Sequence, residues 1–408
     1  MLRGLVTTLC ALIVLAVAMA GQANQDPRWR WRTIETDHFR VTYPQGLLDL
    51  ARRAGHRAET AFDALSRDFV DPPSGKVDLL ITDHADVSNG YAQVHPSNRI
   101  VIFAPPPMDG FDLAHMDEWM ELVIIHELTH VFHVDFTGSL GGCFRKVFGR
   151  YPVQWPFFPG AATPDWTVEG IATYYESSLT EAGRIRGSFH EMVLRTAVLE
   201  GRFESIDQTS GDSPVWPGGQ RYYVYGSLFL QRMLDRYGQE AMRAFVEAVA
   251  GQWIPYRLNA AAREAFGTSF SEELKAWEEE LEREYSALRD SLTEWRDLTR
   301  GEALTEDGYY ALRPAPSPDG RRLAYARFDG KSDLQIRLMD LETGELESLS
   351  RTNRLSNFSW TPGGGILLSQ VEYTDSYRIR GDLFFADGAG AVRQVTRGDR
   401  LDPVSYTH

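Results

Sequence analysis

The pattern of hydrophobic and polar positions divides the chain into parts with different periods. Residues 29–43 alternate over short stretches, which is typical of strands. Residues 47–69 carry apolar side chains at helical spacing. Residues 76–82 and 98–104 are short apolar runs of the kind found in buried strands. We therefore predict that the chain begins with a small α/β unit.

Helical spacing dominates the middle of the chain. It is interrupted at residues 136–163, an aromatic stretch rich in Pro and Gly that we predict to be a long loop. Residues 269–298 are expected to form a long, charged amphipathic helix that packs back on the domain, rather than a coiled-coil face for a partner. The other helices are predicted at residues 117–135, 166–178, 183–200, 222–237, 239–250 and 260–266.

After about residue 301 the pattern changes to short strands and turns, and it repeats. Residues 314–326 (PAPSPDGRRLAYA) align with residues 358–370 (FSWTPGGGILLSQ) at an offset of 44 residues. A period of about 40–50 residues with such turns is typical of a β-propeller blade. Residues 402–408 resemble the start of a third copy, so we expect a truncated chain with about two blades. A β-hairpin tail outside any propeller is the alternative.

Composition and charge narrow the class of protein. The chain has 408 residues, enough for two or three domains. Its net charge of −15, without a long basic run, argues against nucleic-acid binding. Residues 1–20 combine Arg3, an apolar run and the sequence Ala-Met-Ala, as in a secretory signal peptide. A membrane anchor is the alternative, although the apolar run is short for a bilayer. We expect a periplasmic or secreted bacterial protein with no stable membrane span after cleavage.

The number of cysteines predicts a mature chain without disulfides. Cleavage after Ala20 leaves a single cysteine, Cys143, so no internal disulfide is possible. We predict that Cys143 is a buried free thiol in an apolar loop. Stability must then come from the hydrophobic core and from any bound metal.

The apolar run from Val123 to His133 contains the pattern His-Glu-x-x-His. On a helix, positions i and i+4 share one face, so His126 and His130 offer two imidazoles to one ion. Glu127 is rotated by about 100° from His126 and points beside that ion rather than at it. The pattern therefore predicts a metal site with a free carboxylate next to it.

A third ligand is expected from a second helix. Glu169 lies within the sequence DWTVEGIATYYE, 39 residues after His130. Two His and one carboxylate leave a fourth position for water, which is the layout of a hydrolytic zinc site. His133 is an alternative third ligand or a polar residue of the cleft. Glu176 and Asp135 are candidate hydrogen-bond partners for the metal-binding imidazoles, or surface ion-pair residues.

These two motifs carry a resemblance to a known family. His126–His130 (HELTH) followed by Trp166–Glu176 (WTVEGIATYYE) resembles the gluzincin clan, whose second helix reads Trp-x-x-Glu-Gly-x-Ala-x-Tyr-x-Glu. The nearest match is the bacterial peptidase-MA-like group, often fused to a TolB-like or WD-like propeller. The resemblance implies an α+β fold: a catalytic domain at residues 27–300, with a small α/β part and a helical part, and then a partial propeller at residues 301–408. The spacer between the motifs is longer than in the clan, which implies an inserted loop.

The resemblance also implies roles for individual residues. His126, His130 and Glu169 would bind Zn²⁺, and Glu127 would be the general base that acts on a zinc-activated water. In aminopeptidases of the clan, a Gly-x-Met-Glu-Asn segment before the zinc helix holds the free amine of the substrate. This chain lacks that segment, which favours an endopeptidase.

A tyrosine and an edge strand are implied in the same way. Tyr223 begins a Tyr-x-x-Gly pattern before a hydrophobic helix and would stabilise the oxyanion, with Tyr222 and Tyr225 as alternatives. Gluzincin clefts have an edge strand to which a peptide adds as an extra strand, and a short segment of this chain resembles that strand. The alternative is that this segment is a hairpin turn. Its residues are Asn89, Gly90, Tyr91 and Ala92.

Three functions follow from these features. The first is a zinc metallopeptidase that acts on a peptide or protein substrate. The second is a catalytically weak or inactive scaffold whose propeller binds a protein or envelope partner. The third is a zinc hydrolase of a non-peptide amide. The presence of Glu127 together with all three expected ligands favours an enzyme over a scaffold.

Overall fold

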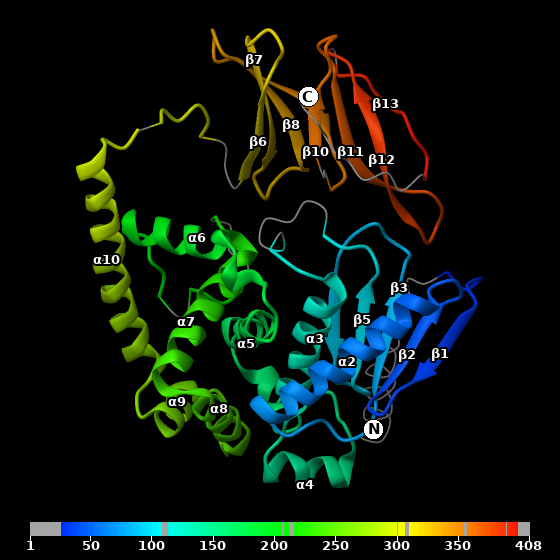
Figure 1. Ribbon diagram of the computed structural model, residues 1–408, viewed down its shortest axis with the longest axis vertical. Helices are drawn as coiled ribbons and strands as arrows, with labels where there is room; N and C mark the ends of the chain where they lie inside the picture. Colours follow the sequence, from blue (N-terminus) through cyan, green and yellow to red (C-terminus); the bar gives the residue numbers. More distant parts are fainter. Residues whose placement is uncertain are drawn as a thin grey trace, which may run out of the picture.

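The described residues form a mixed α+β fold with one five-stranded sheet and two four-stranded sheets (Figure 1). This confirms the predicted class at that level. The expected signal peptide and the expected third repeat lie outside the described residues. The computed structural model describes residues 26–107, 113, 115–205, 208–211, 216–299, 301–306, 310–354, 357–388 and 390–398.

The five-stranded sheet has the order β1-β2-β3-β5-β4. Strands β2, β3 and β5 are parallel, whereas β1 and β4 pair antiparallel at the two edges. Strand β4 contains Gly90, Tyr91 and Ala92 of the predicted edge strand and lies at a sheet edge, whereas Asn89 precedes it. Helix α2 (Leu48–Asp68) turns small buried alanines toward the sheet, which allows close packing. The strands are β1 (Trp31–Glu35), β2 (Phe39–Pro44), β3 (Val77–Thr82), β4 (Gly90–Gln93) and β5 (Arg99–Phe103).

Helix α3 (Trp119–Asp135) carries the His-Glu-x-x-His motif through the centre of the molecule. It contacts α2 on one side and α5 (Asp165–Ser178) on another, and it also packs on β4 and β5. Nearly all of its side chains are buried, so apolar residues occur on every side of the helix. This packing holds the imidazoles rigidly between the sheet and the helical layer.

Helices α5 and α7 (Arg221–Tyr237) cross with their backbones in contact. A Cβ added at Gly170 would lie 2.6 Å from the carbonyl carbon of Gly226, and one added at Gly226 would lie 2.1 Å from the carbonyl oxygen of Trp166. Only glycine allows this approach. The crossing brings the start of α7, which carries Tyr223, close to Glu169 on α5.

The remaining helices extend the core away from the sheet. Helix α10 (Phe270–Trp295) begins with a capping box between Ser269 and Glu272. Its first half buries Phe270, Leu274 and Trp277, so the prediction that it packs back on the domain is confirmed there. None of the described helices has the length and apolar character needed to cross a bilayer. The others are α6 (Ser188–Leu199), α8 (Gln239–Gly251) and α9 (Leu258–Phe266), with short 3₁₀ turns η2 (Arg184–Arg186) and η3 (Gly218–Gln220).

The predicted loop at residues 136–163 is partly wrong. It contains helix α4 (Ser139–Phe148) and the 3₁₀ turn η1 (Pro159–Ala162). The prediction that Cys143 is buried is also wrong, because α4 lies on the surface and leaves this thiol exposed. Apolar content alone could not reveal that this helix leaves much of its apolar surface to solvent.

The repeated C-terminal pattern forms two successive four-stranded antiparallel sheets, each a simple meander. Their facing side chains share one hydrophobic core. Within the described residues the two sheets do not close a ring. The strands are β6 (Tyr310–Pro316), β7 (Arg322–Phe328), β8 (Gln335–Asp340), β9 (Leu346–Arg351), β10 (Asn357–Trp360), β11 (Ile366–Tyr373), β12 (Ile379–Ala386) and β13 (Val392–Gln394).

The second of these sheets docks on the loop between β3 and β4. Ile379 forms a short parallel bridge with Ala85. The Arg380 guanidinium donates to the Asp86 carboxylate at 3.1 Å and to the Asp83 carbonyl oxygen at 2.9 Å. The loop that these contacts brace leads directly into the edge strand β4.

Candidate metal centre

Three side chains converge at the junction of α3 and α5. The Nε2 atoms of His126 and His130 lie 3.1 Å apart, and each lies 3.3 Å from Oε2 of Glu169. Among the described residues, these three form a group of possible metal ligands whose ligand atoms all lie within 4.8 Å of one another. The structure therefore brings together the three residues that the sequence motifs singled out.

The size of this triangle fits zinc. Tetrahedral zinc with Zn–N and Zn–O bonds of about 2.0–2.1 Å separates its ligand atoms by about 3.3–3.4 Å. The observed sides of 3.1, 3.3 and 3.3 Å are close to that spacing. Two ring nitrogens and one carboxylate oxygen are also the donor set of hydrolytic zinc sites.

A buried carboxylate orients the first imidazole. Glu176 is fully buried on α5, and its Oε2 lies 2.9 Å from Nδ1 of His126. An ionised carboxylate can only accept, so Nδ1 donates to Glu176, although Nη2 of Arg184 also lies 2.9 Å from this nitrogen. With Nδ1 held in this way, Nε2 is the ring nitrogen that could bind a metal beside His130 and Glu169. Glu176 thus takes the position that the sequence predicted for a hydrogen-bond partner of a candidate metal ligand.

Arg184 completes this support and was not predicted from the sequence. Its guanidinium donates to both carboxylate oxygens of Glu176 at 2.8 Å, and its backbone N–H donates to Oε1 at 3.2 Å. Burial opposes ionisation of Glu176, but Arg184 and His126 lower its pKa to about 2. Arg186 lies only two residues further along the chain, so only the fold shows which arginine pairs with Glu176.

The charged groups around the triangle stabilise positive charge between its three atoms. Burial alone would lower the pKa of His126, but Glu169 and Glu176 raise it to about 9. Burial alone would raise the pKa of Glu169, but His130 and His126 hold it far below its usual range. The side chains therefore stabilise positive charge where the three ligand atoms meet.

Glu127 lies next to this triangle without belonging to it. Its side chain is buried, and burial raises its pKa although His126 and His130 oppose the shift. It faces the edge strand, since a Cβ added at Gly90 would lie 2.9 Å from its Oε1. A buried carboxylate with a raised pKa, between a strand and two imidazoles, is suited to accept a proton.

Tyr223 reaches the same space from the start of α7. Its ring lies 6.4 Å from the ring of His126, and the Arg184 guanidinium lies 4.5 Å from its centroid. Burial raises the pKa of Tyr223, so its phenol stays protonated and able to donate. Tyr225 is directed elsewhere, because its hydroxyl accepts from the backbone N–H of Glu204. The ring of Tyr222 lies 4.6 Å from the ring of Tyr223 and is tilted from it by 44°.

A cleft of about 190 Å³ opens beside these groups. One wall is the segment Ser88–Gly90 at the start of β4, so Asn89 and Gly90 border the space as the sequence predicted. Tyr91 and Ala92 continue along the same edge strand, with Tyr91 exposed to solvent. The other lining residues are Leu113, Trp119, Leu122, Val123, His126, Glu127, Glu176, Arg184, Gln220 and Tyr223.

Two predicted neighbours of the site lie elsewhere. His133 is buried beside Phe69, and its ring nitrogens have no hydrogen-bond partner among the described residues. Burial lowers its pKa to about 3, so it is neutral. Asp135 binds Arg145 and Arg150 at 2.8 and 2.9 Å, and so anchors α4 and the segment after it rather than an imidazole.

Gly90→Ala is expected to displace the Glu127 carboxyl group. If this carboxyl group serves in peptide hydrolysis, kcat should fall by about 10- to 100-fold, because small displacements of a reacting group have effects of this order. The added methyl would lie 2.6 Å from Cγ2 of Val123 and 2.9 Å from Oε1 of Glu127. The measurement is kcat on a quenched fluorescent peptide, with zinc content determined in parallel. Gly142→Ala is the control, since a Cβ there meets nothing within 4 Å. Unchanged kcat in Gly90→Ala would contradict this placement of Glu127.

Comparisons with known proteins give a limited result. No family model matches the chain, and no curated protein matches it. Among solved structures, the chain is similar to the crystal structure of TolB from Acinetobacter baumannii, with 24% identity and a TM-score of 0.21. That match covers 24% of this chain and 24% of the TolB chain, so it spans about a quarter of the length of TolB. The gluzincin resemblance remains a prediction from the motifs.

Proposed function

We propose that this protein is a zinc-dependent metallopeptidase that cleaves internal peptide bonds of a protein substrate in the periplasm or outside the cell. The observation that carries the proposal is the convergence of His126, His130 and Glu169 within a triangle of 3.1–3.3 Å sides. The gluzincin resemblance of the two motifs points to the same function. The proposal extends to a gluzincin fold for the part of the chain before the two blades.

The roles of the side chains follow from their positions. Zinc held by the three ligands would act as a Lewis acid on the scissile carbonyl and on the attacking water. Glu127 would take a proton from that water and return it to the leaving amine. The phenolic hydroxyl of Tyr223 would donate a hydrogen bond to the carbonyl oxygen as negative charge develops there. Glu176 and Arg184 would hold His126 in the orientation that binding requires.

The edge strand supports a peptide rather than a small amide as substrate. Strand β4 pairs with β5 on one side, and the sheet order leaves its other side at the sheet edge. An extended peptide could add to this edge through main-chain hydrogen bonds and lie along the cleft next to Glu127. The missing Gly-x-Met-Glu-Asn segment supports cleavage within a chain rather than at its amino end.

Removal of the metal tests the proposal. Dialysis against a zinc chelator is expected to abolish the cleavage of labelled casein, and about one equivalent of Zn²⁺ should restore it. Cleavage that persists after the zinc has been removed would contradict the proposal. Zinc binding without cleavage of casein or of peptides would favour a scaffold function, and cleavage of non-peptide amides alone would favour the third candidate.

A further inference from the structure

A group of exposed apolar side chains lies at one end of the molecule. Trp253, Ile254 and Tyr256, in the loop between α8 and α9, are 78%, 64% and 74% exposed. Such a concentration of exposed apolar side chains is uncommon on a soluble surface without a binding role. We call these residues, with five from α4 and the segment after it, the aromatic edge; the five are Phe144, Val147, Phe148, Tyr151 and Val153.

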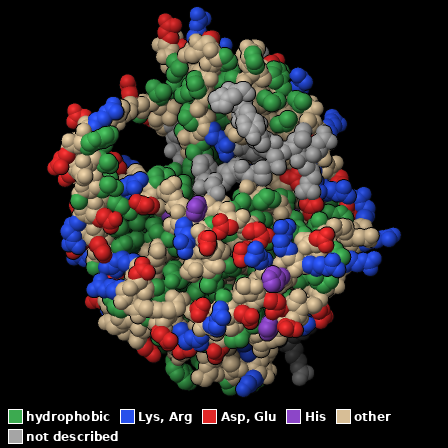
Figure 2. All heavy atoms as spheres, viewed as in Figure 1, with side chains coloured by type: hydrophobic (Ala, Val, Ile, Leu, Met, Phe, Trp, Pro, Cys, Tyr) green, Lys and Arg blue, Asp and Glu red, His purple; other side chains and the backbone are tan. Residues whose placement is uncertain are grey.

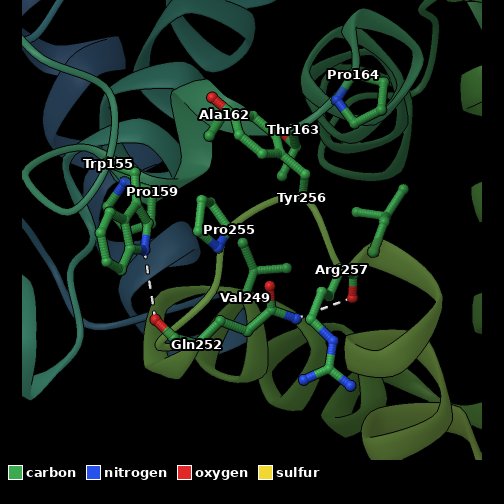
Figure 3. Close-up of a pocket in the computed structure, with 11 residues that line it drawn as sticks. Trp155, Pro159, Ala162, Thr163, Pro164, Val249, Gln252, Pro255, Tyr256 and Arg257 are labelled. Atoms are coloured by element: carbon green, nitrogen blue, oxygen red, sulfur yellow. Dashed lines mark hydrogen bonds between the residues drawn. The ribbon is translucent and has the colours of Figure 1, made fainter.

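The two segments of the aromatic edge are held against each other. The indole N–H of Trp155 donates to the carbonyl oxygen of Gln252 at 3.3 Å, as the dashed line in Figure 3 shows. Between the segments lies an apolar recess of about 90 Å³. Figure 3 shows Trp155, Pro255 and Tyr256 around it, together with Gln252. The segment after α4 and the α8–α9 loop therefore meet, and the residues of the aromatic edge belong to the two chain segments that form this junction.

The tip of the α8–α9 loop is fixed in an outward position. The Gln252 side-chain amide donates to the carbonyl oxygen of Arg257 at 2.9 Å and closes the loop at its base. Tyr256 has φ +66°, in the left-handed region that a tyrosine rarely adopts. An unfavourable backbone that leaves a large aromatic ring in solvent indicates a functional constraint on this loop.

The charge of these segments is opposite to that of the whole chain. The chain carries a net charge of −15, yet residues 144–158 and 251–258 contain four basic residues and no Asp or Glu. Arg145 and Arg150 are paired with Asp135, whereas Lys146 and Arg257 are exposed. Elsewhere, as over the face shown in Figure 2, acidic and basic side chains are interspersed.

We propose that the aromatic edge docks the protein on an anionic lipid surface. Trp and Tyr combine an apolar ring with a polar atom, which suits the boundary between lipid headgroups and acyl chains. Exposed Lys146 and Arg257 supply the charge that anionic headgroups attract. The exposed side chains at the tip of the α8–α9 loop can enter the soft boundary of a bilayer. The recess of about 90 Å³ between the segments is smaller than the roughly 300–1,000 Å³ of typical ligand pockets, which argues against a peptide as the occupant.

The docked orientation follows from the fold. Helices α4, α8 and α9 lie at the end of the molecule opposite the two C-terminal four-stranded sheets (Figure 1). Contact through the aromatic edge would therefore turn these two sheets away from the lipid and leave them free to bind other proteins.

Vesicle co-sedimentation of the purified protein tests this proposal. Vesicles of phosphatidylcholine with phosphatidylglycerol should bind the protein at least tenfold more strongly than vesicles of pure phosphatidylcholine. Each of the two exposed cations, Lys146 and Arg257, contributes about fivefold to the affinity for anionic lipid. The double variant Trp253→Ala, Tyr256→Ala should bind at least tenfold more weakly, and Lys146→Glu with Arg257→Glu should abolish the preference for anionic lipid. The matched control is Trp295→Ala at the end of α10, where the indole is 85% exposed.

The outcomes separate the proposal from its rivals. Near-equal thermal unfolding of the double variant and the parent protein would show that lost binding is not lost folding. Absence of binding to either vesicle, or equal binding by the double variant, would overturn the proposal. Self-association that is lost in the double variant, without lipid binding, would also overturn it and assign the edge to contacts between copies.

Discussion

Glu127→Gln is expected to lower peptide hydrolysis by roughly 10²- to 10⁴-fold while zinc remains bound. The amide keeps the shape of the carboxyl group but cannot accept a proton at the reaction pH, and general acid–base catalysis contributes an effect of this size. Zinc should be retained because the ligand triangle consists of His126, His130 and Glu169 and does not include Glu127. The measurement is kcat/KM on a quenched fluorescent peptide, with zinc quantified in the same preparation.

The matched control for this variant lies on the same helix. Glu121 lies six residues before Glu127 on α3, where it accepts a hydrogen bond from Arg57 at 3.0 Å. Glu121→Gln should change kcat/KM by less than about twofold, because partly exposed ion pairs contribute little. A Glu127→Gln protein that binds zinc and retains parental activity would show that the general base lies elsewhere or that the observed cleavage comes from a contaminant.

Glu176→Gln is expected to destabilise the metal-free protein by about 3–5 kcal/mol, because it leaves the buried Arg184 guanidinium without its charge partner. It should also weaken zinc binding by about 10- to 100-fold, since His126 loses the carboxylate that orients it. The measurements are urea denaturation of the chelated protein at pH 7 and zinc affinity by competition with a chromophoric chelator.

The pH dependence provides an independent check on Glu176. Its pKa is lowered from 4.5 to about 2 in the folded protein. A lowered folded pKa stabilises the fold above the unfolded pKa, and this contribution disappears as the pH falls from about 4.5 to about 2. The difference between parent and Glu176→Gln should therefore be largest near neutral pH and shrink in acid.

Glu280→Gln serves as the control for stability. Glu280 pairs with Arg232 at 2.9 Å, but its side chain is 53% exposed, so we expect a loss below about 0.5 kcal/mol. Equal stability of Glu176→Gln and the parent at pH 7 would contradict the buried pairing of Glu176 with Arg184.

Local periodicity was sufficient to predict most of the described helices, but not the order of the strands in the five-stranded sheet. The apolar spacing placed helices α2, α3, α7 and α10 within a few residues of their ends. The repeat at an offset of 44 residues predicted two similar four-stranded sheets. Both patterns are local in the sequence, so they can be recognised without knowledge of tertiary contacts.

The ligand triangle could be predicted for a different reason. The spacing of His126 and His130 on one helix fixes their common direction, and Glu169 lies in a motif that the resemblance had already singled out. Helix α4 could not be predicted in this way, because Gly141 and Gly142 weaken its helical signal and its apolar residues do not mark a buried face.

Contacts between distant residues account for the other differences. Arg184 pairs with Glu176 through a turn whose geometry no local pattern encodes. Asp135 was expected near the imidazoles, but Arg145 on α4 and Arg150 just after it bind it instead. Such pairings depend on where the chain returns after a loop, which periodicity does not specify.

The most direct test of the metal centre is the zinc content of the purified protein, measured by inductively coupled plasma mass spectrometry for the parent and for Glu169→Ala. We predict about one zinc ion per parent chain and almost none in the variant after the same dialysis, since the carboxylate supplies one of three protein ligands. A parent chain without zinc after growth and purification with zinc, or equal zinc in both proteins, would contradict the site formed by His126, His130 and Glu169.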